Sequence, residues 1–153
     1  MTASDGITPI HIVLVEDNEA DIELTRIAFE RGRIMNRMTV LSHGREALEW
    51  FQALSRGEHS DRPDLVLLDL NLPGVNGDEI LREMKGDAAL VMIPVVVLTT
   101  SEDDADVAAA YREHANAFMT KPVDYDRFLK LVRGITDYWF TLVRLPAEGG
   151  AGK

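Results

Sequence analysis

Four short aliphatic runs of the sequence each lead into a side chain that can do chemistry. "HIVLV" leads into Glu16-Asp17, "LVLLD" ends in Asp69, "VVVL" leads into Thr99, and "AFMT" leads into Lys121. Carboxylates can hold a hard cation or attack an electrophile, while a hydroxyl or ammonium group can bind an anionic oxygen. The question is whether the fold brings these groups together.

The same runs predict the strands that would carry them. They are continuous in aliphatic residues and alternate with helical segments, which is typical of a parallel sheet covered on both faces. Ligands of such a sheet bind beyond the carboxyl ends of the strands, so all four chemical groups are expected at one edge. The predicted strands are 11–15, 38–41, 65–69, 95–98 and 117–120.

Helical periodicity predicts the segments between the strands. The first helix follows Asn18 and stops at Gly32, and the last begins at about Asp124. Ser101 and Asp104 have the spacing of a capping box for the helix after the fourth strand. The apolar faces of the first three helices are expected to contain Ile22, Ile27 and Phe29; Ala47, Leu48, Phe51 and Leu54; and Ile80, Leu81 and Met84.

Length and composition indicate one domain. The chain has 153 residues, of which 46% are hydrophobic, enough for one substantial core. We expect a flexible N-terminus over residues 1–9, a domain over 10–146 with an extended last helix, and a flexible tail over 147–153.

Charge and residue usage exclude several classes of protein. A formal net charge of -10 without a basic patch argues against nucleic-acid binding. The chain has no cysteine, no apolar stretch of membrane-spanning length and no signal-peptide pattern, so we expect a cytoplasmic protein that does not bind a membrane. Metal-ligand spacing is missing among the histidines, which we interpret as ordinary surface or strand residues: His11, His43, His59 and His114.

The motifs "VEDNEAD", "LLDLNLPGVNG", "VVVLTTSEDD" and "AFMTKPVD" resemble the receiver domain of two-component response regulators over about residues 10–135. Their order and approximate spacing are those of the family. The resemblance implies a flavodoxin-like, doubly wound α/β fold. Its five-stranded parallel sheet would have the order 2-1-3-4-5, with helices on both faces.

The resemblance also implies a phosphorylation site that uses Mg²⁺, with Mn²⁺ or Ca²⁺ as substitutes. By family correspondence Asp69 is the phosphoacceptor. The metal ligands would be Asp17, Asp69 and the backbone carbonyl of Asn71, with Glu16 acting through water. Receivers often have Asp-Asp where this chain has Glu16-Asp17, and Glu-Asp also occurs among them. Such an oxygen set suits Mg²⁺, which keeps several waters and binds carboxylates together with phosphate oxygens.

Further residues have implied roles in binding the phosphoryl group and in signalling. Thr99 would be the switch hydroxyl, Phe118 the switch aromatic and Lys121 the phosphate partner, with Pro122 in a cis peptide bond that directs the Lys121 ammonium inward. Asn71 and Ser101 occupy the positions that tune phosphoryl hydrolysis in this family.

Other interpretations of the same residues are weaker. An Asp-nucleophile phosphatase of the haloacid dehalogenase type needs an acidic second residue in D-x-D, whereas Asp69-Leu70-Asn71 ends in an amide. A nucleotide-binding fold needs a glycine-rich loop where this chain has "EDNEAD". A degenerate receiver that works as a phosphorylation-independent binding module remains an alternative, although every phosphorylation residue is present.

The C-terminal segment predicts a protein interface. Phe128, Val132, Ile135, Trp139 and Leu142 form one apolar stripe that a single domain can bury. Tyr138, Phe140, Val143 and Leu145 lie outside this stripe and need a second surface to cover them. We therefore expect a homodimer through the last helix and its extension. This ending resembles single-domain response regulators that partner with phytochromes, and it implies a sensor histidine kinase, with a bacteriophytochrome as candidate. The expected interface residues are Ile135, Tyr138, Trp139, Phe140, Leu142, Val143 and Leu145.

Overall fold

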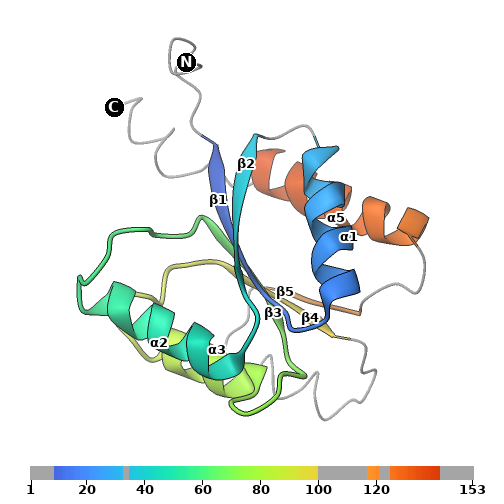
Figure 1. The fold of residues 1–153 in the computed structure, drawn as a ribbon. Helices are drawn as coiled ribbons and strands as arrows, with labels where there is room; N and C mark the ends of the chain where they lie inside the picture. The colour runs from blue at the N-terminus through green and yellow to red at the C-terminus, as the bar shows by residue number, and fades with distance from the viewer. Residues whose placement is uncertain (1–8, 33–34, 100–116, 121–124, 142–153) are drawn as a thin grey trace, which may run out of the picture.

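A five-stranded sheet with helices on both faces forms the centre of the protein (Figure 1). The computed structural model describes residues 9–32, 35–99, 117–120 and 125–141. Its elements in chain order are β1 (Ile10–Val15), α1 (Glu19–Glu30), β2 (Asn36–Leu41), α2 (Gly44–Ser55), β3 (Leu65–Asp69), α3 (Gly77–Lys85), β4 (Val95–Thr99), β5 (Ala117–Thr120) and α5 (Tyr125–Thr141).

The strand order confirms the predicted doubly wound topology. It is β2-β1-β3-β4-β5, and all four strand pairs are parallel. The order reverses between β1 and β3, which lie side by side with Val15 opposite Leu68. In doubly wound sheets the ligand crevice forms at this reversal, beyond the carboxyl ends of the strands. The residues that follow β1 and β3 therefore lie where the fold places a site.

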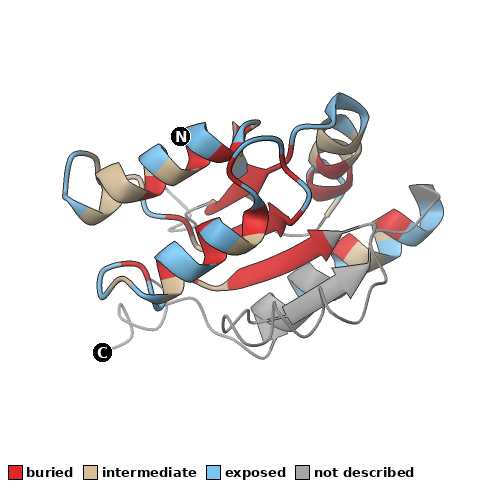
Figure 2. Cartoon of the chain, turned by 90° about the horizontal axis from the view of Figure 1, so that it is seen from below, coloured by how far each residue is buried: buried red, intermediate tan, exposed pale blue. Residues whose placement is uncertain are grey.

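Each face of the sheet has its own core because side chains alternate along a strand. Ile12 and Leu67 pack in the core under α1 and α5, while Val13 and Val66 pack in the core under α2 and α3. In Figure 1, α1 and α5 lie side by side on one face and α2 and α3 on the other. Figure 2 shows buried strands at the centre of the sheet and buried residues on the sheet-facing sides of the helices; β1, β3 and residues 95–98 of β4 are buried.

The predicted helix faces agree well with the observed burial. All three residues predicted for α3, Ile80, Leu81 and Met84, are buried. On α2, Ala47 and Phe51 are buried while Leu48 and Leu54 are partly buried against them. On α1, Phe29 is buried, whereas Ile22 and Ile27 are half-buried.

Two element boundaries differ from the prediction by two residues. Helix α1 ends at Glu30 rather than Gly32: the Arg31 N–H bonds the Ile27 carbonyl and the Gly32 N–H bonds the Phe29 carbonyl, which closes the helix. Strand β2 begins at Asn36, two residues before the predicted start, because it pairs with β1 along the whole length of that strand. The β2 difference arises from strand pairing, and the α1 difference arises from the local hydrogen bonds that close the helix; apolar periodicity reports neither.

Several predictions fall outside the described residues. The helix expected after β4, with its Ser101–Asp104 capping box, and the terminal segments 1–8 and 142–153 belong to this group. In the described part of the chain, none of the helices combines the length and the apolar character needed to cross a bilayer.

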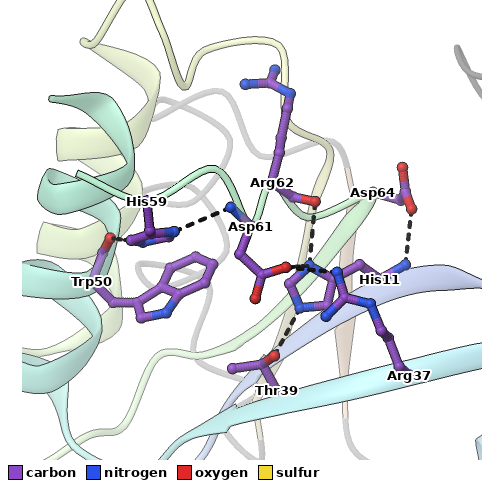
Figure 3. Close-up of polar contacts among 8 residues, drawn as sticks. All are labelled: His11, Arg37, Thr39, Trp50, His59, Asp61, Arg62 and Asp64. Carbon is purple, nitrogen blue, oxygen red and sulfur yellow. Dashed lines mark hydrogen bonds and ion pairs between the residues drawn. The ribbon is translucent and has the colours of Figure 1, made fainter. Parts of the chain in front are cut away.

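A polar cluster organises the amino-terminal edge of the sheet (Figure 3). His11 of β1 is only 2% exposed and contacts β2 and the loop that leads to β3. Its backbone N–H donates to Asp64, at 2.8 Å. The ring of His59 lies against Trp50 of α2, with 4.6 Å between ring centroids. This cluster lies at the start of β1 and β3, whereas Glu16, Asp17 and Asp69 lie at the opposite ends of these two strands.

Candidate functional site

Asp69 is the last residue of the central strand β3 and is buried to 7% exposure. Its neighbours in β3 are fully apolar, so the strand ends in a carboxylate at the edge of the core. The backbone N–H of Asn71 donates to Asp69 Oδ1 at 3.0 Å. This bond helps to orient the carboxylate, which a nucleophile or a metal ligand requires.

Glu16 and Asp17 follow β1 and lie beside Asp69. One carboxylate oxygen from each of the three residues lies within 4.8 Å of the other two. Glu16 is buried, at 2% exposure, and its Oε2 accepts the Asn18 N–H at 3.3 Å, while Asp17 is exposed. The structure thus brings together the three acids that the strand ends predicted.

This cluster fits a hard divalent cation. Three carboxylates at such short range repel one another, and the burial of two of them weakens screening by solvent. Mg²⁺ prefers oxygen ligands and is usually bound through one or two carboxylates, with water completing its shell. Among the described residues, the carboxylate oxygens of Glu16, Asp17 and Asp69 are placed so that they could hold a metal ion.

The loop that follows Asp69 folds back on the end of its own strand. The Gly77 N–H donates to the Leu70 carbonyl at 3.0 Å, which closes the loop. A Cβ atom at Gly77 would lie 2.4 Å from the backbone oxygen of Asp69, so this approach requires glycine. The side chain of Asn76 then caps α3 by accepting the Glu79 N–H at 3.4 Å. The sequence pattern indicated the turn but not this contact with Asp69.

The predicted switch residues Thr99 and Phe118 are placed by the register of their strands. Thr99 ends β4, immediately after Leu98, which pairs with Asp69. Phe118 lies in β5 opposite Val97, and the side chains of both Thr99 and Phe118 are outside the described set. The backbone therefore places Thr99 one residue beyond the register position of Asp69.

Other predicted residues are outside the described part or are described only by their backbone. Lys121, Pro122 with its expected cis bond, and Ser101 lie outside it. Of the expected interface residues, Ile135, Tyr138, Trp139 and Phe140 lie in α5, and Leu142, Val143 and Leu145 lie beyond the described range.

A groove opens beside Asp17, between α1 and the end of β2. Its volume is about 690 Å³. Ile22 and Val40 line its apolar part, and Pro73 comes from the loop after Asp69. Asp17 of the acidic cluster thus also lines a surface depression. The full lining is Asp17, Glu19, Ile22, Glu23, Arg26, Val40, Ser42, His43 and Pro73.

The fold and the site together define a class: doubly wound α/β proteins with a group of acidic residues, able to hold a cation, at the reversal of strand order. The sequence matches the response regulator receiver domain family over residues 12–133. The chain belongs to this family, whose members act in two-component signalling. The predicted family and fold are both confirmed.

Within this family the chain is similar to two cyanobacterial response regulators, Rcp1 and RcpA. The chain is 42% identical over 139 residues to response regulator Rcp1 of Synechocystis, a match that covers 91% of this chain and 95% of that protein. The phosphorylated cyanobacterial phytochrome response regulator RcpA has a similar structure, with a TM-score of 0.83 at 37% identity over 91% of this chain and 99% of that one. The Mn²⁺-bound form of Rcp1 has a TM-score of 0.82 at 41% identity, and the match covers 90% of this chain and 99% of that one. The chain is therefore a receiver related to phytochrome response regulators.

Proposed function

We propose that this protein accepts a phosphoryl group on Asp69 from a sensor histidine kinase in the cytoplasm, in a reaction that requires Mg²⁺. The observation that carries the proposal is the close group of Glu16, Asp17 and Asp69. Membership of the receiver family and the Mn²⁺-bound form of the similar protein Rcp1 support it. Mn²⁺ and Ca²⁺ are the expected substitutes for Mg²⁺.

The residues of this chain contribute orientation and the nucleophile. An oxygen of Asp69 forms the new P–O bond while the P–N bond of the donor phosphohistidine breaks, and the leaving imidazole nitrogen keeps the electron pair and takes up a proton. Asn71 limits rotation of the Asp69 carboxylate through its N–H. Asp17 and Asp69, with the Asn71 carbonyl and with Glu16 through water, would hold the cation. A bound divalent cation supplies positive charge that offsets the charge of the transferring phosphoryl group.

The remaining predicted residues would read and end the phosphorylated state. The Thr99 hydroxyl and the Lys121 ammonium donate hydrogen bonds to phosphoryl oxygens, and Phe118 moves into the space that Thr99 leaves. Pro122, in the cis form, would direct Lys121. The phosphoryl group then leaves by hydrolysis, at a rate that Asn71 and Ser101 tune. In this scheme the protein assists its own phosphorylation and dephosphorylation but is not an enzyme acting on a separate substrate.

We further propose a phytochrome-type kinase as donor and a homodimer as the signalling form. The similarity to RcpA and Rcp1 supports the first part. The apolar residues of α5 and the segment after it support the second: Ile135, Tyr138, Trp139, Phe140, Leu142, Val143 and Leu145. With a formal net charge of -10, the signal would pass by protein contact rather than through nucleic acid.

Intact-mass measurement tests the central proposal. With Mg²⁺ and a small phosphodonor the protein should gain one phosphoryl group, and Asp69→Asn should gain none. Asp64→Asn makes the same acid-to-amide change at the opposite end of β3 and should be labelled normally. Full labelling of Asp69→Asn, or equal labelling after chelation of the metal, contradicts the proposal. A protein that never takes up phosphate would instead support the degenerate receiver.

A further inference from the structure

Helix α2 begins against the loop that follows Asp69. A Cβ atom built on Gly44, the first residue of α2, would lie 1.7 Å from the carbonyl oxygen of Val75 and 2.7 Å from its carbonyl carbon. Ordinary contacts of a Cβ atom begin at 3.4 Å. Both atoms of Val75 belong to the backbone, so no side-chain rotation could relieve the overlap. The absence of a side chain at Gly44 is therefore a condition for this packing.

The loop held by Gly44 is anchored at several points. Leu70, Leu72 and Val75 are all buried in the core shared with α2 and α3. Gly77 closes the loop through its hydrogen bond to the Leu70 carbonyl. In a close-packed core such a loop cannot shift at one residue while its neighbours stay in place. A displacement at Val75 would therefore be transmitted along the loop to the residues that follow Asp69.

Asn71 connects this loop to the acidic cluster. Its N–H holds Asp69 Oδ1 at 3.0 Å, and it lies between the buried residues Leu70 and Leu72. We propose that Gly44 is a positioning residue for the cation site: it allows α2 to hold the loop so that Asn71 and Asp69 keep the geometry the cation needs. This inference rests on the proposed function, because it concerns the same site.

The first turn of α2 is itself fixed. The Ser42 N–H donates to Glu46 Oε1 at 3.1 Å, which ties the residue before the N-cap to the third residue of the helix. His43, the N-cap residue, makes no side-chain capping bond. The Glu46 carboxylate is therefore a side-chain group that fixes the first turn of α2. This contact offers a second way to disturb the support without adding an atom.

The main test is the dissociation constant for Mg²⁺, measured by titration calorimetry on the full chain well below its melting temperature. Gly44→Ala should weaken Mg²⁺ binding by about tenfold or more, the range seen when groups that orient metal ligands are removed. Ala53→Gly serves as control: it weakens α2 near its other end, adds no atom near the loop, and should leave the constant unchanged. A purely structural role of Gly44 would lower stability in both variants but would not change Mg²⁺ affinity.

A pair of variants at Glu46 keeps the test valid if Gly44→Ala does not fold. Glu46→Gln removes the charge but keeps an acceptor oxygen, while Glu46→Ala removes both. The side chain is exposed, so both variants should fold. If the start of α2 supports the site, Glu46→Ala should bind Mg²⁺ several-fold more weakly than Glu46→Gln.

The outcomes separate this inference from the proposed function. If the wild-type protein does not bind Mg²⁺, the proposed function and the role of Gly44 are both overturned. If the wild type binds Mg²⁺ and a folded Gly44→Ala binds it equally well, the role of Gly44 alone is overturned. Where Gly44→Ala does not fold, equal constants for the two Glu46 variants overturn it in the same way.

Discussion

His11 Nε2 lies 2.7 Å from the hydroxyl oxygen of Thr39, across the paired strands β1 and β2 (Figure 3). The other ring nitrogen, Nδ1, lies 3.2 Å from the carbonyl oxygen of Arg62. A carbonyl oxygen can only accept, so Nδ1 carries the proton of this bond, and in the neutral ring Nε2 accepts the Thr39 hydroxyl proton. Both nitrogens of this buried ring are thus satisfied by groups from two different elements.

The first prediction follows from this pairing. Thr39→Val keeps the shape of the side chain but leaves the buried His11 Nε2 without the hydroxyl, which should cost about 1 to 3 kcal/mol of unfolding free energy. Thr39→Ser keeps the hydroxyl and is the matched control. Urea unfolding at neutral pH measures both. A loss of stability in Thr39→Ser without a loss in Thr39→Val would mean that the methyl group, not the hydrogen bond, stabilises the pairing.

The sequence predicted the grouping of the three acids because they lie at strand ends. An aliphatic run that stops in Asp69 or leads into Glu16 can be recognised in the sequence alone. Parallel topology then brings the ends of adjacent strands to one edge of the sheet. The three acids are accordingly close together in the structure.

What the sequence could not predict are contacts between segments distant in the chain. Gly44 and Val75 are 31 positions apart by their numbers, and nothing in either local pattern indicates that they touch. His11 was expected to be an ordinary surface or strand residue. It is a strand residue, but its burial depends on partners in β2 and in the loop before β3. Local periodicity reports which face a residue occupies, not which atoms meet there.

The second prediction concerns stability and the cation. If Mg²⁺ binds the acidic cluster of the native state, it should raise the unfolding free energy by about 2.7 kcal/mol at a hundredfold excess over Kd. Asp17→Asn should lose most of this gain and, without metal, should be more stable than the wild type because one of three crowded charges is gone. Thermal melts with and without Mg²⁺ measure both effects.

Glu19→Gln is the control for this experiment. Glu19 is an exposed acid at the start of α1, two positions after Asp17, and is not among the three acids of the cluster. It should keep the full Mg²⁺-dependent gain. An undiminished gain in Asp17→Asn would remove Asp17 from the set of metal ligands.

The third prediction concerns pH. The hydrogen bond from Arg37, at 2.6 Å, lowers the pKa of Asp61 below its ordinary value of 3.8; burial opposes this shift, and the positive charge of Arg37 adds to it. A carboxyl group with a lowered folded-state pKa stabilises the protein above pH 3.8, and this contribution is lost as the pH falls through the folded-state value. Asp61→Asn should lack this part of the acid dependence of unfolding.

Arg37→Met tests the same interaction from the other side, because without the donor the pKa of Asp61 should return toward 3.8. The two single variants and the double variant should show the same reduced acid dependence, measured by urea unfolding below pH 5. Acid dependence as steep in Asp61→Asn as in the wild type would show that other carboxyl groups cause it.

The fourth prediction concerns the proposed homodimer. The stripe that begins with the buried residues Phe128 and Val132 can be covered within one domain. Further apolar residues lie outside this stripe: Tyr138, Phe140, Val143 and Leu145. Each is worth roughly 1.5 to 3 kcal/mol when buried, and a twofold contact would bury the same patch on both copies. Truncation after Thr136 should therefore give a monomer that still accepts phosphate on Asp69.

Light scattering at high micromolar concentration measures this, with truncation after Pro146 as the matched control. The control removes only "AEGGAGK", which contains no large apolar side chain, so the dimer should persist. Loss of the dimer in the longer truncation alone would locate the interface between Asp137 and Pro146. A full-length protein that stays monomeric with and without phosphate would mean that the apolar segment covers its own domain, and the proposed homodimer would be wrong.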